Sequence, residues 1–105
     1  MKEVFSYLDA HYTDPTLTLT SVSEYFGYSY SNFSHWFRSH TGITFSSYLD
    51  KLRIEHSKKL LCSTQMTIEQ IATAIGYTNA GTFTRIFKKH ENIAPGCFRK
   101  NVSED

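Results

Sequence analysis

The chain has 105 residues, which suits one domain or two very small subdomains that share a connector. Its net charge of +1 is unevenly placed: residues 1–50 carry two basic and five acidic side chains, and residues 51–105 carry nine basic and five acidic ones. The sequence holds no run of about 18 apolar residues and no signal-peptide pattern, which argues against a membrane-spanning or secreted protein and predicts a soluble, cytoplasmic one.

The N-terminal stretch predicts two short helices separated by a turn. The first has apolar side chains three or four residues apart and ends near Asp14-Pro15, because proline disfavours helix in the residue before it. Thr18 is placed to cap the second helix, and Gly27 can adopt the left-handed conformation that closes it. The inward residues are expected to be Val4, Phe5, Leu8, Tyr12, Leu19, Val22 and Phe26.

A third helix and a long fourth helix follow. Ser29 is placed to cap the third helix, which ends near Thr41-Gly42 and turns Phe33, Trp36 and Phe37 inward. The fourth helix is predicted from Phe45 to about Ser63, with one apolar stripe and a polar back. Arg53 lies in it between apolar neighbours, which leaves open a buried ion pair with a carboxylate such as Glu24 or Asp50.

The segments on either side of the long helix repeat one pattern. Leu19 to Gly27 recurs as Ile68 to Gly76 at an offset of 49, and Phe33 to His40 recurs as Phe83 to His90 at an offset of 50. Two copies indicate a duplicated small motif and not a solenoid, which needs at least three repeats.

The second copy has clear helix signals of its own. Thr67 and Gln70 form a capping box, and either Thr78 or Asn79 starts the next helix. Asn92 takes the place of Gly42 and tolerates the same positive φ. Pro95 suits the first turn of a last short helix, and no segment alternates as a strand would. The fold class is therefore predicted to be all-α.

Two short helices joined by a tight turn that begins with glycine are the layout of a helix-turn-helix, whose second helix enters the DNA major groove. Arg85 is the strongest candidate for a base contact, because its guanidinium fork matches the two acceptors on a guanine edge. The predicted base-contacting residues are Tyr30, Ser31, Ser34, His35, Ala80, Gly81, Thr84 and Arg85. The predicted phosphate-contacting residues are Ser29, Arg38, Thr78, Asn79 and Lys88.

The long helix would set the distance between these two reading helices. About 18 residues span about 27 Å, and the helical bodies at its ends bring the separation near one DNA turn of roughly 34 Å. We predict that both reading helices enter successive major-groove segments on one face of the duplex, which bends if they cannot align with a straight one.

The residues quoted so far resemble the DNA-binding domain of the AraC/XylS family of bacterial transcription regulators, from about Val4 to Arg99. The matching motifs include Phe26-Gly27-Tyr28-Ser29, Arg53-Ile54, Leu60-Leu61, Ile71-Ala72, Gly76-Tyr77, Phe87-Lys88, Pro95 and Phe98-Arg99. The resemblance implies seven helices in two homeodomain-like helix-turn-helix subdomains joined by a long central helix. It also implies binding to double-stranded promoter DNA and, usually, recruitment of RNA polymerase to activate transcription.

The sequence departs from this family in a few places. Ser23 and Ser57 stand where the family mostly has alanine, a change that is tolerable if each hydroxyl bonds back to its own helix. Ala94 replaces a capping serine or threonine, so the last helix is expected to fray. The first reading helix is short of long basic or amide side chains, which leaves open a first unit that mainly holds phosphates.

We expect three parts: a first helix-turn-helix subdomain over residues 1–44, a linker helix over 45–65 and a second subdomain over 66–105. These residues include no effector pocket, small-molecule site or dimerisation element. The chain is therefore expected to be a monomeric C-terminal part of a longer, nucleoid-associated regulator, which dimerises, if at all, through an N-terminal domain. A stand-alone small regulator is the alternative.

Other kinds of site are weakly indicated. Two cysteines, Cys62 and Cys97, make no metal knuckle or disulfide framework, so partly buried thiols are expected. The five histidines lack metal-ligand spacing and the hydroxyl residues lack a catalytic order, so neither a metal, a cofactor nor an enzyme is predicted. The low net charge and the polar first reading helix leave one rival function open, a helical protein-interaction module that has lost DNA binding.

Overall fold

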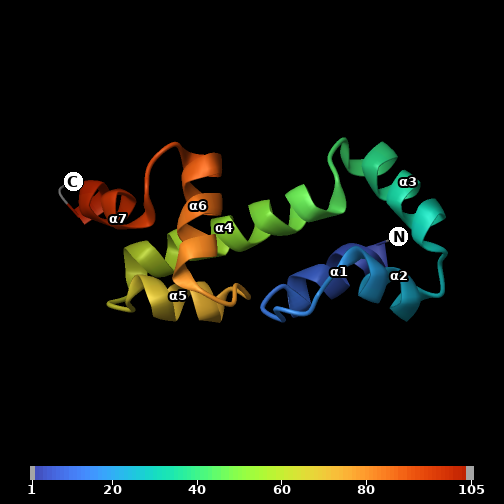
Figure 1. Ribbon diagram of the computed structural model, residues 1–105, viewed down its shortest axis with the longest axis horizontal. Coiled ribbons are helices and arrows are strands. Elements are labelled where there is room, and N and C mark those ends of the chain that lie inside the picture. Colours follow the sequence, from blue (N-terminus) through green and yellow to red (C-terminus); the bar gives the residue numbers. More distant parts are fainter. Residues whose placement is uncertain (1, 104–105) are drawn as a thin grey trace.

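The computed structural model describes residues 2–103, and these fold into seven α-helices without a strand. The fold confirms the predicted all-α class and the long central helix (Figure 1). The helices are α1 (Lys2–His11), α2 (Leu19–Phe26), α3 (Tyr30–Thr41), α4 (Phe45–Ser63), α5 (Ile68–Ala74), α6 (Ala80–Glu91) and α7 (Pro95–Ser103).

The helices begin where side chains satisfy their first free amides. The Thr18 hydroxyl accepts the Ser21 N–H at 3.1 Å, while the Ser21 hydroxyl accepts the Thr18 N–H at 2.9 Å. The Thr67 and Gln70 pair forms the capping box predicted for α5. Asn79, and not Thr78, caps α6, since its Oδ1 accepts the Thr82 N–H at 2.8 Å.

The helices end where the backbone can turn left-handed. Gly27 closes α2 with φ 76°, and Gly42 closes α3 with φ 82°. Asn92 closes α6 with φ 70°, as its position in the repeat predicted.

Each half of the molecule has a core of its own, and α4 contributes to both. The N-terminal half of α4 adds Phe45 and Leu49 to a core built on α1, α2 and α3. The C-terminal half adds Ile54 and Leu61 to a core built on α5 and α6. Among the described residues, Tyr12 packs against both cores. The exact boundaries of the three parts stay a prediction.

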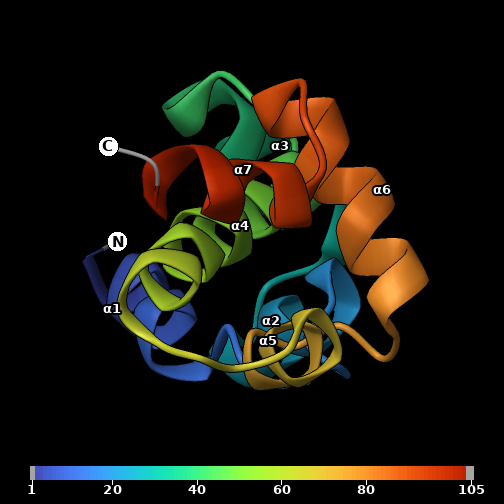
Figure 2. The ribbon, with the colours of Figure 1, turned by 90° about the vertical axis from the view of Figure 1, so that its left-hand side faces the viewer.

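The molecule is elongated, with extents of 47 × 23 × 22 Å. Figure 1 shows α3 beyond the N-terminal end of α4 and α6 across the C-terminal half of α4, with α1, α2 and α5 below it. Figure 2, viewed nearly along α4, shows α6 on the outer edge of the molecule and α5 and α2 at the opposite side from α3. Within residues 2–103, no helix combines the length and the apolar character that a membrane crossing requires.

Two serines in packed helices form hydrogen bonds within their own helix. The Ser23 hydroxyl donates to the Thr20 carbonyl at 2.9 Å, and the Ser57 hydroxyl donates to the Ile54 carbonyl at 2.6 Å, so both serines bond back as expected. The prediction of partly buried thiols is wrong, because Cys62 and Cys97 are both exposed. Cys62 in α4 and Cys97 in α7 lie on the solvent-facing sides of their helices.

Candidate nucleic-acid interface

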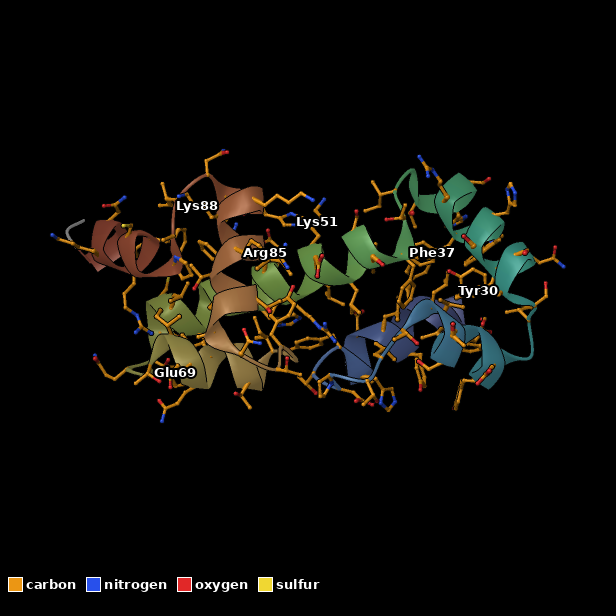
Figure 3. The ribbon with its side chains drawn as sticks, in the orientation of Figure 1. Tyr30, Phe37, Lys51, Glu69, Arg85 and Lys88 are labelled. Atoms are coloured by element: carbon orange, nitrogen blue, oxygen red, sulfur yellow. The ribbon has the colours of Figure 1, made fainter. Side chains whose placement is uncertain are left out.

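The inward face of α6 is fixed by apolar residues three and four positions apart. Phe83 and Phe87 are fully buried, and Ile86 is 9% exposed. Because a helix turns once every 3.6 residues, roughly, the opposite side of this 12-residue helix faces solvent. Figure 3 shows Arg85 and Lys88 on α6, and both are exposed.

The other predicted reading residues of α6 are small and lie beside Arg85. Gly81 is exposed, whereas Ala80 and Thr84 are partly buried. None of the predicted residues of α6 is therefore enclosed in the core. Small side chains at these positions leave room for a large partner to approach the helix backbone closely.

The first reading helix, α3, repeats this arrangement with different side chains. Phe33 and Phe37 are buried, and Tyr30 is 57% exposed at the start of the helix (Figure 3). Ser31, His35 and Arg38 are exposed, and Ser34 is partly buried. Trp36, predicted to point inward, is only half-buried and stacks on His40 with ring centroids 5.2 Å apart.

The start of each reading helix presents backbone amides and capping side chains. The Ser29 hydroxyl accepts the Asn32 N–H at 3.2 Å, and the side-chain Oδ1 of Asn79 has the same role in α6. Their capping oxygens are therefore engaged, but the hydroxyl hydrogen of Ser29 and the amide hydrogens of Asn79 can still be donated. Thr78, exposed just before Asn79, adds a further hydroxyl. Such helix starts are suited to anions.

Polar contacts hold α6 on α4 near both of its ends. Lys58 on α4 forms an ion pair with Glu91 at the C-terminal end of α6, with Nζ and Oε1 3.2 Å apart. Before the helix starts, the Tyr77 hydroxyl donates to Oδ1 of Asp50 at 2.8 Å. Burial raises the pKa of Tyr77, and the hydrogen bond to Asp50 raises it further, so this hydroxyl stays protonated.

Arg53 is buried, and of the alternatives that the sequence left open the structure shows hydrogen bonds to backbone carbonyls and not an ion pair with Glu24 or Asp50. It is 6% exposed, and its guanidinium donates to the carbonyl oxygens of Tyr12 and Asp14 at 2.8 and 2.9 Å. The Tyr77 ring lies against it, with the guanidinium carbon 5.2 Å from the ring centroid. Burial lowers the pKa of Arg53, yet a guanidinium remains charged in proteins.

Other positioning residues were not found by the sequence analysis. Arg99 on α7 donates to carbonyl oxygens at the end of α4 and just beyond it, those of Leu61 at 3.1 Å, Met66 at 2.7 Å and Thr64 at 3.3 Å. Asp50 was considered only as a partner of Arg53. The spacing of these residues in the sequence carries no signal that pairs them, because their contacts cross more than 25 positions of chain, 27 for Asp50 and Tyr77.

Comparison with known proteins shows the family. A family model described as a helix-turn-helix domain matches residues 22–101. The arabinose operon regulatory protein of Escherichia coli K12 is 32% identical over 104 residues, which are 99% of this chain and 36% of that protein. The chain belongs to the AraC/XylS family. It is an AraC-type DNA-binding domain of a transcription regulator, which confirms this part of the predicted function.

Solved structures of AraC-type domains match the whole architecture. The C-terminal domain of the two-component response regulator YesN from Fusobacterium nucleatum superposes with a TM-score of 0.91 and 32% identity, covering 93% of this chain and 95% of that one. The DNA-binding domain of AdpA, solved with a target DNA, superposes with a TM-score of 0.93 over 98% of this chain and 92% of that one. At 18% identity this second likeness shows the fold alone.

The curated AraC-type relatives are longer than this chain. The chain spans between 13% and 36% of the length of those relatives.

Proposed function

We propose that the chain binds promoter DNA sequence-specifically, with α3 and α6 in successive major-groove segments on one face of the duplex. The observation that carries this proposal is that two repeat-related helices carry exposed polar side chains, and that α3 lies beyond the N-terminal end of α4 while α6 crosses its C-terminal half (Figure 1). The 19 residues of α4 extend about 28 Å. The longest extent of the molecule, 47 Å, exceeds the roughly 34 Å of one DNA turn. Any residual mismatch would be taken up by bending the duplex.

In this proposal α6 reads the greater part of the sequence. Arg85 donates two hydrogen bonds to a guanine edge, and the methyl groups of Ala80 and Thr84 contact a thymine methyl. Gly81 allows the helix to sit deep in the groove. In α3 the reading residues are Tyr30, Ser31, Ser34 and His35, which are shorter or less basic than Arg85.

The phosphate contacts fix the register of both helices. Arg38 and Lys88 supply charge, while the starts of α3 and α6 supply amides together with Ser29, Thr78 and Asn79. Besides Arg85, α6 carries the exposed cations Lys88 and Lys89, whereas α3 carries the exposed cation Arg38. We therefore propose that the second unit provides most of the electrostatic affinity.

The family supports a proposal about the role in the cell. We propose that the domain belongs to a longer bacterial regulator, acts on the nucleoid in the cytoplasm and activates transcription by contacting RNA polymerase. The support for this step is the membership of the AraC/XylS family.

The test is an electrophoretic shift assay on duplex fragments enriched from a random pool by repeated binding to the chain. Each phosphate neutralised lowers the logarithm of the affinity by about 0.9 per logarithmic unit of salt, so the affinity should fall steeply between two salt concentrations. Failure to enrich any sequence, with no salt dependence, would overturn the proposal in favour of a protein-interaction module.

A further inference from the structure

Three segments that are far apart in the sequence meet at Arg53. Its Nε donates to the carbonyl oxygen of Tyr12 at 2.8 Å, and its Nη2 donates to that of Asp14 at 2.9 Å. Both carbonyls lie in the loop between α1 and α2, which belongs to the first helix-turn-helix subdomain, here called the first unit; the second subdomain is the second unit. The other side of the guanidinium lies against the ring of Tyr77, which belongs to the turn of the second unit.

The turn of the second unit also touches the first unit directly. A Cβ on Gly76 would lie 2.6 Å from the carbonyl oxygen of Tyr12 and 2.9 Å from Nε of Arg53, so the two backbones approach closely. Tyr77 is then fixed by its hydrogen bond to Asp50 on α4. The ring of Tyr12 stacks on His56, with centroids 4.1 Å apart and an interplanar angle of 12°.

The carbonyls that Arg53 binds are themselves held in place. Oδ1 of Asp14 accepts hydrogen bonds from the backbone N–H and the hydroxyl of Thr16 at 2.8 and 2.7 Å. The backbone N–H of Asp14 donates to the carbonyl of His11 at 3.0 Å. The loop is thus a tight turn and not a loose segment. Arg53 therefore binds a defined surface of the first unit.

The contacts of Arg53 with Tyr12, Asp14 and Tyr77, together with the approach of Gly76 to Tyr12, form a junction between the two units. This junction lies beside α4 and gives the two units a second connection. A single helix fixes the distance between two bodies, but long helices are rarely straight and curve gently. A second link placed off the helix axis opposes rotation of one unit about that axis. Arg53 carries this link because it contacts the first unit and the second unit at the same time.

We propose that Arg53 is a positioning residue that sets the spacing of the two half-sites, in base pairs, that the chain accepts. This inference rests on the proposed binding of α3 and α6 to successive major grooves. One base pair of extra spacing moves a half-site by about 3.4 Å and turns it by about 35° around the duplex. A rigid junction rejects such a displacement, whereas a loosened one follows it.

The experiment uses the enriched fragment described above, whose two protected segments are located by footprinting. From it a series is made with one or two base pairs inserted or deleted between the segments, and Kd is measured for each member. Arg53→Met keeps the apolar stem and removes the donors. Tyr77→Phe removes only the hydroxyl that binds Asp50. Lys59→Met, at an exposed position of α4, is the matched control for loss of a cation.

We expect the wild-type chain to lose about tenfold or more in affinity for each single base-pair change, the scale of one mismatched contact. Arg53→Met should flatten this dependence to about threefold or less, Tyr77→Phe should flatten it partly, and Lys59→Met should keep it. Circular dichroism and a thermal melt establish whether each variant is folded. If Arg53→Met is not folded, the spacing dependence of Tyr77→Phe tests the inference in its place.

Two results would overturn the inference. The first is that Arg53→Met folds and depends on the spacing as sharply as the wild-type chain does. If Arg53→Met does not fold, the same result for a folded Tyr77→Phe overturns the inference. The other is a wild-type chain that binds a specific sequence but is indifferent to spacing, which leaves the DNA-binding proposal intact. A wild-type chain that enriches no sequence at all counts against the proposed function itself.

Discussion

The carbonyl oxygen of Tyr12 lies 2.6 Å from the place that a Cβ on Gly76 would occupy, so the two units touch where no side chain fits between them. Gly76 also has φ 103°, which disfavours any other residue. Its counterpart in the first copy, Gly27, has φ 76°, but nothing lies within 4 Å of its missing Cβ. Gly27 is thus required for its positive φ alone. Gly76 is required both for its positive φ and for the close approach of the Tyr12 carbonyl.

This difference predicts unequal costs for the same substitution. Gly27→Ala should lower the free energy of unfolding by about 1–2 kcal/mol, the cost of a left-handed conformation for a residue with a Cβ. Gly76→Ala bears a similar cost and also drives a methyl group into backbone, which adds about 1–3 kcal/mol. Urea denaturation of the two variants measures both values. Equal losses would show that the contact between Gly76 and Tyr12 relaxes freely.

A second prediction concerns the division between base reading and phosphate holding on α6. Arg85→Ala should weaken the enriched site by about 1–3 kcal/mol and relax the choice of base at one position, because the guanine contact is lost. Lys88→Ala should weaken all sequences alike and reduce the salt slope by about 1. Binding measured on single-base variants of the site at two salt concentrations distinguishes the two effects.

The matched comparison for Arg85 is Arg38 on α3, which is also an exposed arginine of a reading helix. We propose that Arg38 contacts a phosphate, so Arg38→Ala should behave as Lys88→Ala does and leave the choice of base unchanged. Unaltered base discrimination in Arg85→Ala would contradict the assignment of the reading face.

A third prediction concerns Arg99, whose guanidinium binds three carbonyl oxygens at and beyond the end of α4. Arg99→Met should lower the free energy of unfolding by about 1–3 kcal/mol, since hydrogen bonds from charged donors are among the stronger ones. The exposed neighbour Lys100, changed to Met, should alter stability by less than about 0.5 kcal/mol. Hydrogen exchange of the α7 amides should quicken in Arg99→Met and not in Lys100→Met. If the two variants are equally stable, Arg99 does not anchor α7.

Local sequence signals predicted most of the fold. The periodicity of apolar residues placed the first six helices and Pro95 placed the last, and the long helix runs from Phe45 to Ser63 as expected. Capping signals did equally well, because a cap depends on residues three positions apart: Thr18, Ser29 and the Thr67 box all act as predicted. Asn92 was assigned its left-handed conformation from its place in the repeat alone.

What the sequence could not predict depends on contacts between distant segments. Tyr28 and Tyr77 occupy equivalent positions after the repeat glycines, yet Tyr28 is 42% exposed and Tyr77 is 7% exposed. Only the second lies against α4 and Arg53, and no local pattern distinguishes them. The same reason explains Arg53, whose burial the sequence left open and whose partners are backbone carbonyls. Any residue type supplies a carbonyl, so the sequence gives no signal for such a partner.

The predicted reading residues show the same division. Their placement on the outer faces of α3 and α6 follows from the periodicity of the buried phenylalanines, and all of them are exposed or partly buried. Which of them contact bases depends on how the two units are oriented about α4. That orientation is set by the junction at Arg53, which the periodicity does not describe.

The last prediction concerns His56, which stacks on Tyr12 beside this junction. Burial lowers the pKa of His56, and the nearby charge of Lys59 lowers it further, while Asp9 and Glu55 act in the opposite direction. In the unfolded chain its pKa returns to about 6.5, so the unfolded state binds the proton more tightly. The stability contributed by neutral His56 is therefore complete above about pH 6.5 and is lost as the pH falls through the folded-state pKa.

We expect the Tm of the wild-type chain to fall more between about pH 7.5 and 5.5 than that of His56→Phe, which keeps a ring against Tyr12 but does not titrate. Lys59→Met should reduce the fall only partly, because burial, the larger cause, remains. An NMR titration of His56 in both the wild-type chain and Lys59→Met measures the shift directly. Identical pH profiles of Tm for the wild-type chain and His56→Phe would show that His56 titrates alike in the folded and unfolded states, and that its burial does not resist protonation.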